Sequence, residues 1–253
     1  MLKLIKPIMI AMAVPTFAVT FPATASAEEI ECPFDEFNEN RRGIIGCYHS
    51  EISPAEAFAE TVAIGKWSDR SRKAVLLDVR STPEYKAGHP QRSYNVPYPF
   101  IYQYCDDVDN SGPQDDRRPD GACKSGGERI SQPAEDFVAY VESIVPDKNT
   151  PIFTMCRTGV RSVGAAEVLT LAGYKEVRNI WEGFVGINLT APNQVDPTLT
   201  NPTGVGPVDL NHDGELTDED KNGWRYHQGL PYETRLLPSL MWLGEGADTY
   251  YLP

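Results

Sequence analysis

Short apolar runs alternate with stretches of helical spacing through the middle of the chain. The runs AVLLDV (74–79) and PIFTMC (151–156) are short and largely apolar, EVRNI (176–180) is a further candidate strand, and SYNVP (93–97) is a weaker one. Apolar runs of this length are typical of parallel strands that are buried on both faces of a sheet. We therefore expect buried strands at these positions.

Helix signals separate these runs. The stretch SPAEAFAETVAI (53–64) opens with a serine N-cap, a proline at the first helical position and a glutamate at the reciprocal capping position, which predicts a helix over 54–64. The same pattern predicts a helix over about 133–145, and a third helix is expected to begin near Ser162 and to end at Gly173. This alternation indicates an α/β fold with a doubly wound, mostly parallel sheet and helices on both faces.

Two long stretches interrupt the alternation. Residues 101–130 are acidic and rich in turn residues, and residues 188–221 are rich in Pro, Asn, Gly and Asp. Loops of this length inside a compact domain are usually functional, disordered or cross-linked. We therefore expect one domain over 28–253 with two long insertions.

The first 27 residues have the pattern of a secretory signal peptide. Two lysines precede an apolar run, which ends in the small residues ATASA before the acidic EEIE. A membrane anchor is the alternative, but two prolines interrupt the run and leave it shorter than a membrane span requires. We expect cleavage after Ala27, a periplasmic or secreted protein, and no membrane contact after cleavage.

The net charge of the chain limits the classes of partner that it can bind. The formal net charge is −13, and loss of the two lysines of the expected leader lowers it to −15. An acidic surface of this size repels phosphate backbones, so nucleic acid is excluded as a partner.

Five cysteines follow the expected leader: Cys32, Cys47, Cys105, Cys123 and Cys156. In an exported protein most cysteines are paired, and an odd number leaves one thiol free. Proximity favours Cys32 with Cys47, and Cys105 with Cys123 inside the first insertion. Four cysteines allow three connectivities, so the pairing stays open, and Cys156 remains as the free thiol.

The free thiol stands at the start of the turn CRTGVR, which comprises Cys156, Arg157, Thr158, Gly159, Val160 and Arg161. The expected strand 151–155 brings Cys156 to the carboxyl end of the sheet, where α/β proteins place their chemistry. The following helix directs backbone N–H groups and the positive end of its dipole at the turn, which favours an anion. Two arginines add positive charge, so we interpret Cys156 as a nucleophilic thiolate rather than an inert core cysteine.

The chain also resembles the rhodanese family of sulfurtransferases. The resemblance rests on ISPAEAF, VLLDVRSTPEYKAGHP followed by YNVPY, CRTGVRS, VRNIWEGFVG and NGWRYHQGLPYE, in family order. It covers about residues 50–100, 130–187 and 222–234. The chain departs from the family pattern at Pro90, where Ile or Val is usual, and at the two insertions.

The resemblance implies transfer of sulfane sulfur through a persulfide on Cys156. A small anionic donor such as thiosulfate supplies the sulfur, a thiophilic acceptor removes it, and Arg157 and Arg161 orient the donor. Phosphatases of the same fold have a turn one residue longer between the cysteine and the final arginine, so the resemblance excludes that activity.

The resemblance also assigns supporting residues. Asp78 and Arg80 match the family's DVR and are expected to brace the active-site end of the sheet. Glu84 and His89 match the motif too, and we interpret both as loop-stabilising residues.

The second insertion contains a second candidate site, DLNHDGELTDED (209–220). Read as an EF-hand-type calcium loop, it supplies ligands from Asp209, Asn211, Asp213, the carbonyl of Glu215, and Asp220. The alternative is a solvated acidic turn, because Asp, Asn and Gly favour turns without metal. We expect a structural Ca²⁺ here and no organic cofactor.

Two other functions stay open at this stage. The protein is either the sulfurtransferase described above, a non-catalytic persulfide carrier for a partner protein, or a calcium-dependent binding module on a rhodanese scaffold. The turn motif favours the first. The physiological donor, the acceptor, a protein partner and the oligomeric state are not defined by the motifs.

Overall fold

The structure is a computed structural model that describes residues 31–41, 43–62, 74–103, 129–192 and 205–242. These residues belong to one compact unit, Glu31–Pro253. The expected signal peptide and the expected pair Cys105 and Cys123 lie outside the described residues.

The helices are α1 (Pro54–Thr61), α2 (Thr82–Lys86), α3 (Ala134–Ile144) and α4 (Arg161–Leu171), with the short 3-10 turns η2 (Asp218–Asp220) and η3 (Pro238–Leu240). The strands are β1 (Asn38–Glu39), β2 (Ile45–Gly46), β3 (Ser50–Ile52), β4 (Val75–Asp78), β5 (His89–Pro90), β6 (Tyr94–Asn95), β7 (Phe100–Gln103), β8 (Arg129–Ser131), β9 (Ile152–Met155), β10 (Val177–Ile180), β11 (Thr190–Pro192), β12 (Val205–Pro207) and β13 (Tyr232–Glu233). The predicted helices are present as α1, α3 and α4, and the predicted strands as β4, β6, β9 and β10; helix α2 and the other strands were not predicted.

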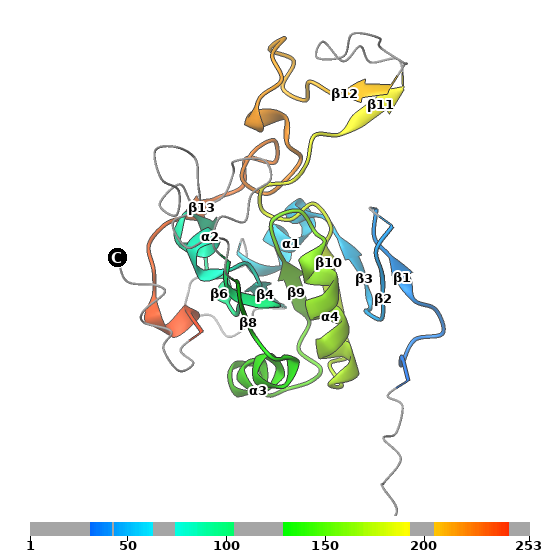
Figure 1. The fold of residues 1–253 in the computed structure, drawn as a ribbon, viewed down its shortest axis with the longest axis vertical. Coiled ribbons are helices and arrows are strands. Elements are labelled where there is room, and N and C mark those ends of the chain that lie inside the picture. The colour runs from blue at the N-terminus through cyan, green and yellow to red at the C-terminus, as the bar shows by residue number, and fades with distance from the viewer. Residues whose placement is uncertain (1–30, 42, 63–73, 104–128, 193–204, 243–253) are drawn as a thin grey trace, which may run out of the picture. The chain divides into compact units, whose positions relative to one another are not determined.

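A five-stranded sheet forms the centre of the described unit (Figure 1). Its strand order is β3-β10-β9-β4-β6, and every neighbouring pair is parallel. The expected parallel sheet is confirmed, including the weak strand near 93–97, which forms β6 at one edge. Parallel strands bring their carboxyl ends to one edge of the sheet, so β4 and β9 end side by side, with Asp78 opposite Met155.

Helices cover both faces of this sheet, as the alternation of elements predicts. Successive side chains of a strand point to opposite faces. Leu77 and Ile152 therefore pack in one core cluster with residues of α3 and α4, while Leu76 and Phe153 pack in a second cluster with Ala57 of α1. Two apolar layers thus hold the sheet between the helices.

The local signals in the sequence act as expected at α1 and α4, but not at the start of α3, where the N-cap residue is Pro133 and gives no side-chain hydrogen bond. Ser53 and Glu56 form the reciprocal capping box of α1, and that helix ends at Thr61, before residues that lie outside the description. Helix α4 ends two residues before Gly173, whose φ of 97° is unfavourable for other residues and stops the helix.

The edges of the two insertions form short antiparallel ladders. Strands β7 and β8 pair at the ends of the first insertion, and β11 pairs with β12 inside the second. At the N-terminal side a disulfide joins Cys32 to Cys47, as proximity predicted. Among the described residues no helix has both the length and the apolar character needed to cross a membrane.

Candidate active site

Cys156 lies directly after β9 and is the free cysteine of the described residues. Its side chain is buried, with an exposed fraction of 1%. The hydroxyl of Ser162 donates to the Cys156 sulfur at 3.4 Å. Ser162 lies in the first turn of α4, so the helix that follows the turn supplies a hydrogen-bond donor to the sulfur.

The turn from Cys156 ends on the N-terminus of α4. Val160 is the N-cap residue of this helix and gives no side-chain hydrogen bond to its first turn. In contrast, Ser53 caps α1 with its hydroxyl. The N-terminus of α4 thus follows the Cys156 turn without a side-chain cap from its N-cap residue, and its positive dipole end favours an anion held at Cys156.

Arg161 is held by a buried carboxylate. Its guanidinium donates to Glu84 with two bonds, of 2.8 and 2.6 Å, and Glu84 also accepts hydrogen bonds from the hydroxyl and the N–H of Ser81. Burial alone raises the pKa of Glu84, but the charges of Arg161 and Arg80 and these hydrogen bonds outweigh it and lower the pKa to about 2. The positive charge of Arg161 is therefore balanced within the protein, and the loop-stabilising interpretation of Glu84 agrees with this geometry.

Asp78 and Arg80 form a second buried ion pair at the same edge of the sheet. Arg80 donates to both oxygens of Asp78 and, at 2.7 Å, to the carbonyl of Gly88, and its guanidinium lies 4.0 Å from the ring centre of Phe184. These contacts tie the ends of two loops together, as expected for a bracing role. His89 is buried as well; its ring stacks on Tyr85 and its Nδ1 hydrogen-bonds the Tyr85 carbonyl.

Segment 181–187, between β10 and the second insertion, holds the outer side of the turn. The N–H of Phe184 donates to the carbonyl of Cys156, and the N–H groups of Val185 and Gly186 donate to the carbonyl of Arg157. This support was not predicted from the sequence. The signal that reveals it is the glycine spacing of WEGFVG, because a Cβ at Gly183 would lie 2.6 Å from the Arg157 backbone.

Gly159 lets the turn fit against this segment. Its φ is 80°, and a Cβ at this position would lie 1.9 Å from the carbonyl oxygen of Trp181. The side-chain amides of Asn40 and Asn179 both donate to the Gly159 carbonyl, at 3.1 and 3.2 Å. The close packing and the positive φ both require glycine here.

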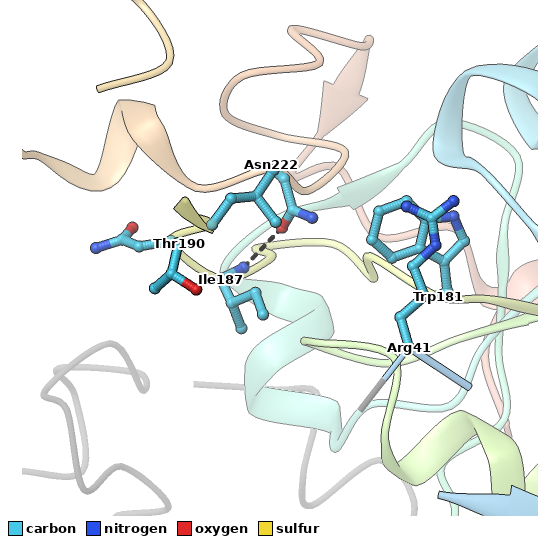
Figure 2. A pocket seen from close by; sticks show the side chains of 7 residues that line it. Arg41, Trp181, Ile187, Thr190 and Asn222 are labelled. Carbon is cyan, nitrogen blue, oxygen red and sulfur yellow. Dashed lines mark hydrogen bonds between the residues drawn. The ribbon is translucent and has the colours of Figure 1, made fainter. Parts of the chain in front are cut away.

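A pocket of about 280 Å³ opens beside this segment (Figure 2). It is lined by Arg41, Trp181, Ile187, Asn188, Leu189, Thr190 and Asn222. The guanidinium carbon of Arg41 lies 3.8 Å from the ring centre of Trp181. Sequence analysis missed this pocket because its walls come from the N-terminal segment, from the residue after β10 and from both ends of the second insertion.

Glu182 is the buried neighbour of this pocket. One of its oxygens accepts from the side-chain amide of Asn222 at 3.3 Å, and the other is buried without a hydrogen bond among the described residues. Burial raises the pKa of Glu182 to about 7, although the nearby charge of Arg41 partly opposes that shift.

The acidic loop 209–220 is closed by its own side chains. Asp209 accepts from the N–H groups of His212 and Gly214, and the buried carboxylate of Asp220 accepts from those of Leu210 and Thr217. The N–H of Thr217 contributes most to lowering the pKa of Asp220.

The expected ligand residues therefore lie on one turn, but their side-chain oxygens accept hydrogen bonds from backbone N–H groups of the same turn. Asn211 and Asp213 accept from the N–H groups of Asp213 and Glu215 respectively. Within the described ranges, no three His, Cys, Asp or Glu side chains are grouped as a metal site. Oxygen donors at this spacing suit Ca²⁺ by chemical type, but the side chains would have to turn towards the ion to bind it.

Comparison with known proteins identifies the domain. A model of the rhodanese-like domain family matches residues 55–190, which is more than half of the chain and includes the Cys156 turn.

Known relatives match this chain at low identity. Rhodanese-like domain-containing protein 17 of Arabidopsis thaliana is 29% identical over 124 residues, covering 48% of this chain and 63% of the relative. Thiosulfate sulfurtransferase 18 of the same plant is 28% identical over 109 residues, covering 43% of this chain and 62% of the relative. The match thus spans less than two thirds of the length of either plant protein. The crystal structure of Rv0390 from M. tuberculosis covers 74% of this chain and 99% of that chain, at 23% identity and a TM-score of 0.41.

Proposed function

The chain belongs to the rhodanese-like domain family, and from this membership we propose that it is a sulfurtransferase that carries sulfane sulfur on Cys156. The observation that carries the proposal is the position of Cys156, a free thiol between the carboxyl end of β9 and the N-terminus of α4, whose N-cap residue gives no side-chain hydrogen bond.

The proposed reaction has two displacement steps at sulfur. The Cys156 thiolate attacks the outer sulfur of a donor such as thiosulfate, the S–S bond of the donor breaks, and sulfite leaves with the bonding electron pair. Cys156 then holds a persulfide. A thiophilic acceptor attacks the outer sulfur, the S–S bond to Cys156 breaks, and the Cys156 thiolate is restored.

The residues around Cys156 fit this reaction in different roles. The N–H groups at the start of α4 and the Ser162 hydroxyl stabilise negative charge on sulfur. Arg161 is paired with Glu84; it stabilises the turn and adds positive charge to it, and it does not bind the donor by itself. Arg157, half-buried on the turn, is the arginine that we assign to donor orientation, with Thr158 and Val160 completing the turn.

Intact-mass analysis of thiosulfate-treated protein tests the proposal. We expect a gain of one sulfur atom, about 32 Da, that cyanide removes as thiocyanate and that Cys156→Ser does not acquire. If the wild-type protein, with Cys156 shown to be a free thiol, gains no sulfur from thiosulfate, polysulfide or mercaptopyruvate, the sulfurtransferase proposal is wrong.

A persulfide carrier is the second candidate function, and the burial of Cys156 favours it. The residue Cys156 has an exposed fraction of 1%, so it is shielded from bulk acceptors. The same mass experiment separates the two functions: an enzyme turns over repeatedly with thiosulfate and cyanide, whereas a carrier forms a long-lived persulfide that small acceptors discharge slowly.

The location and the calcium loop complete the proposal. The disulfide between Cys32 and Cys47 supports an exported protein, because such bonds persist in oxidising compartments. Calcium is plentiful outside the cytoplasm, and there it would order residues 209–220. Its ligands would be Asp209, Asn211, Asp213, the Glu215 carbonyl and Asp220. The ion would take no part in sulfur transfer. Calorimetric titration of Ca²⁺ into the mature protein tests this; no binding heat at millimolar Ca²⁺ would contradict it.

A further inference from the structure

A disulfide-closed segment at the N-terminal side reaches the Cys156 turn. The bond between Cys32 and Cys47 closes residues 32–47, in which β1 pairs with β2, and we call these residues the N-terminal hairpin. The family model begins only at residue 55, so membership of the family assigns the hairpin no role. Whatever the hairpin contributes to the site comes from outside the matched domain.

The N-terminal hairpin is anchored on α4, the helix that follows the Cys156 turn. The N–H of Cys47 donates to a carboxylate oxygen of Glu167 at 3.1 Å, and a Cβ at Gly46 would lie 2.8 Å from the side chain of Val163. The disulfide joins this anchored end to Cys32. Both ends of the hairpin are therefore tied beside the helix, which limits where its tip, residues 40–44, can lie.

Asn40 is fixed at this tip with its amide group directed at the turn. Its N–H donates to the carbonyl of Ile44 at 2.9 Å, and its side-chain oxygen accepts from the N–H of Ile44 at 3.0 Å. Because that oxygen is used within the hairpin, the amide group is left to donate to the Gly159 carbonyl, at 3.1 Å. Asn40 is buried, and the next residue, Arg41, stacks on Trp181 (Figure 2).

The hydrogen bonds to Gly159 fix the plane of the peptide that follows it. The Gly159 carbonyl accepts from Asn40 and from Asn179, so both of its lone pairs are engaged. In a trans peptide the N–H points away from the carbonyl, so the N–H of Val160 is turned away from the two asparagines. Glycine restricts its own backbone least, and this peptide therefore depends on outside donors for its orientation.

We propose that Asn40 is a positioning residue for sulfur transfer. It holds the peptide between Gly159 and Val160 so that its N–H faces the sulfur on Cys156, and the disulfide of the hairpin keeps Asn40 in place. The inference rests on the sulfurtransferase function proposed above. In the first displacement Cys156 bonds the outer sulfur of thiosulfate, and sulfite leaves with the electron pair of the broken S–S bond. The positioned N–H stabilises negative charge on sulfur during this step, and Asn40 acts through the peptide rather than on the donor.

The time course of persulfide formation from thiosulfate, followed by intact mass, tests the role of Asn40. Its amplitude measures how much protein is folded and competent, so a merely structural role would lower the amplitude. For Asn40→Ala we expect the wild-type amplitude and half-saturating thiosulfate concentration, with a limiting rate constant about fivefold lower, as for the loss of one neutral hydrogen bond. A wild-type rate constant, a change in amplitude alone or a change in the half-saturating concentration alone overturns the proposal.

Two further variants separate the amide of Asn40 from the rest of the hairpin. The amide of Asn38 donates to the carbonyls of Tyr48 and His49, outside the turn, so Asn38→Ala should keep the wild-type rate constant. Equal losses in Asn38→Ala and Asn40→Ala would overturn a specific role for Asn40. Asn40→Asp keeps an acceptor for the N–H of Ile44 but lacks the amide donor, so it should be at least as slow as Asn40→Ala. A wild-type rate constant in Asn40→Asp would contradict the proposal.

The disulfide is tested by replacing both of its cysteines, Cys32→Ala with Cys47→Ala. This avoids thiol reductants, which would themselves remove sulfur from a persulfide. Opening the loop should slow persulfide formation in the wild-type background but add no further slowing to Asn40→Ala, because both changes release the same peptide. Additive losses would overturn the link between the disulfide and Asn40. A wild-type protein that forms no persulfide at all would give a different result, which overturns the proposed function itself.

Discussion

Two turns of this protein are built around a glycine of positive φ, yet they are held in different ways. The Cys156 turn contains Gly159, with φ of 80°, and the acidic loop 209–220 contains Gly214, with φ of 89°. The Cys156 turn is fixed from outside: Asn40 bonds the Gly159 carbonyl across 119 residues of sequence, and Glu84 pairs with Arg161 across 77.

The acidic loop is fixed from inside. The hydrogen bonds that Asp209 and Asp220 accept come from backbone groups no more than ten residues away. A Cβ at Gly214 would meet no atom within 4 Å, whereas one at Gly159 would meet the Trp181 carbonyl. The fold therefore imposes the shape of the Cys156 turn, while the shape of the acidic loop depends on its own carboxylates and on any cation that they bind.

The largest effect should follow from removing the external support of the Cys156 turn. In Glu84→Gln the guanidinium of Arg161 loses its buried partner, and breaking a buried pair costs about 3–5 kcal/mol of unfolding free energy. Urea unfolding measures the loss, and persulfide formation should slow in parallel because the turn is no longer held.

The matched control is an ion pair on the surface. Glu142→Gln removes the partner of Lys148, where both side chains are substantially exposed, so its cost should stay below about 1 kcal/mol. Equal losses for the two variants would show that Glu84 does not act as a buried anchor.

Gly159→Ala should come next. The new Cβ would lie 1.9 Å from the Trp181 carbonyl oxygen, a backbone atom that cannot move aside cheaply, and alanine is strained at this φ. We expect a loss of about 3 kcal/mol in urea unfolding. The rate of persulfide formation from thiosulfate should fall with it, and an unchanged rate would mean that the turn does not need this fit.

The ion pair of Glu84 and Arg161 should also make the free energy of unfolding depend on pH in the acidic range. The pKa of Glu84 is lowered to about 2, below its ordinary value of 4.5, so the folded state favours the ionised form. The stabilisation is complete above pH 4.5 and is lost as pH falls towards 2, by an amount of about 3 kcal/mol. Unfolding free energies at a series of pH values should show this loss in the wild type, and Glu84→Gln should lack that component.

These supports also show what the sequence can and cannot predict. Strands β4, β6, β9 and β10, helices α1, α3 and α4 and the Cys156 turn follow from signals within about 15 residues, such as the capping box of α1 and the glycine that ends α4. The match to the family motif indicated that Glu84 stabilises a loop, but its pairing with Arg161 depends on a sheet that brings β4 beside β9. The pocket of Arg41 and Trp181 was not predictable, because three separate segments meet there and none carries a motif for it.

Calcium should affect the acidic loop and not the Cys156 turn. For an extracellular site with a dissociation constant of about 1 mM, 10 mM Ca²⁺ adds about 1.4 kcal/mol of stability. We expect a rise in thermal midpoint of a few degrees in Ca²⁺ but not in Mg²⁺, and none in Asp209→Asn. A rise that persists in this variant would place the cation elsewhere in the protein.

Gly214→Ala should have the smallest effect and gives the sharpest comparison with Gly159→Ala. The substitution and the sign of φ are the same, but a Cβ at Gly214 meets open space. Only the strain of the left-handed backbone remains, about 1 kcal/mol in urea unfolding without calcium. If Gly214→Ala instead costs as much as Gly159→Ala, the acidic loop must pack against other parts of the chain, and its shape is then imposed by the fold as that of the Cys156 turn is.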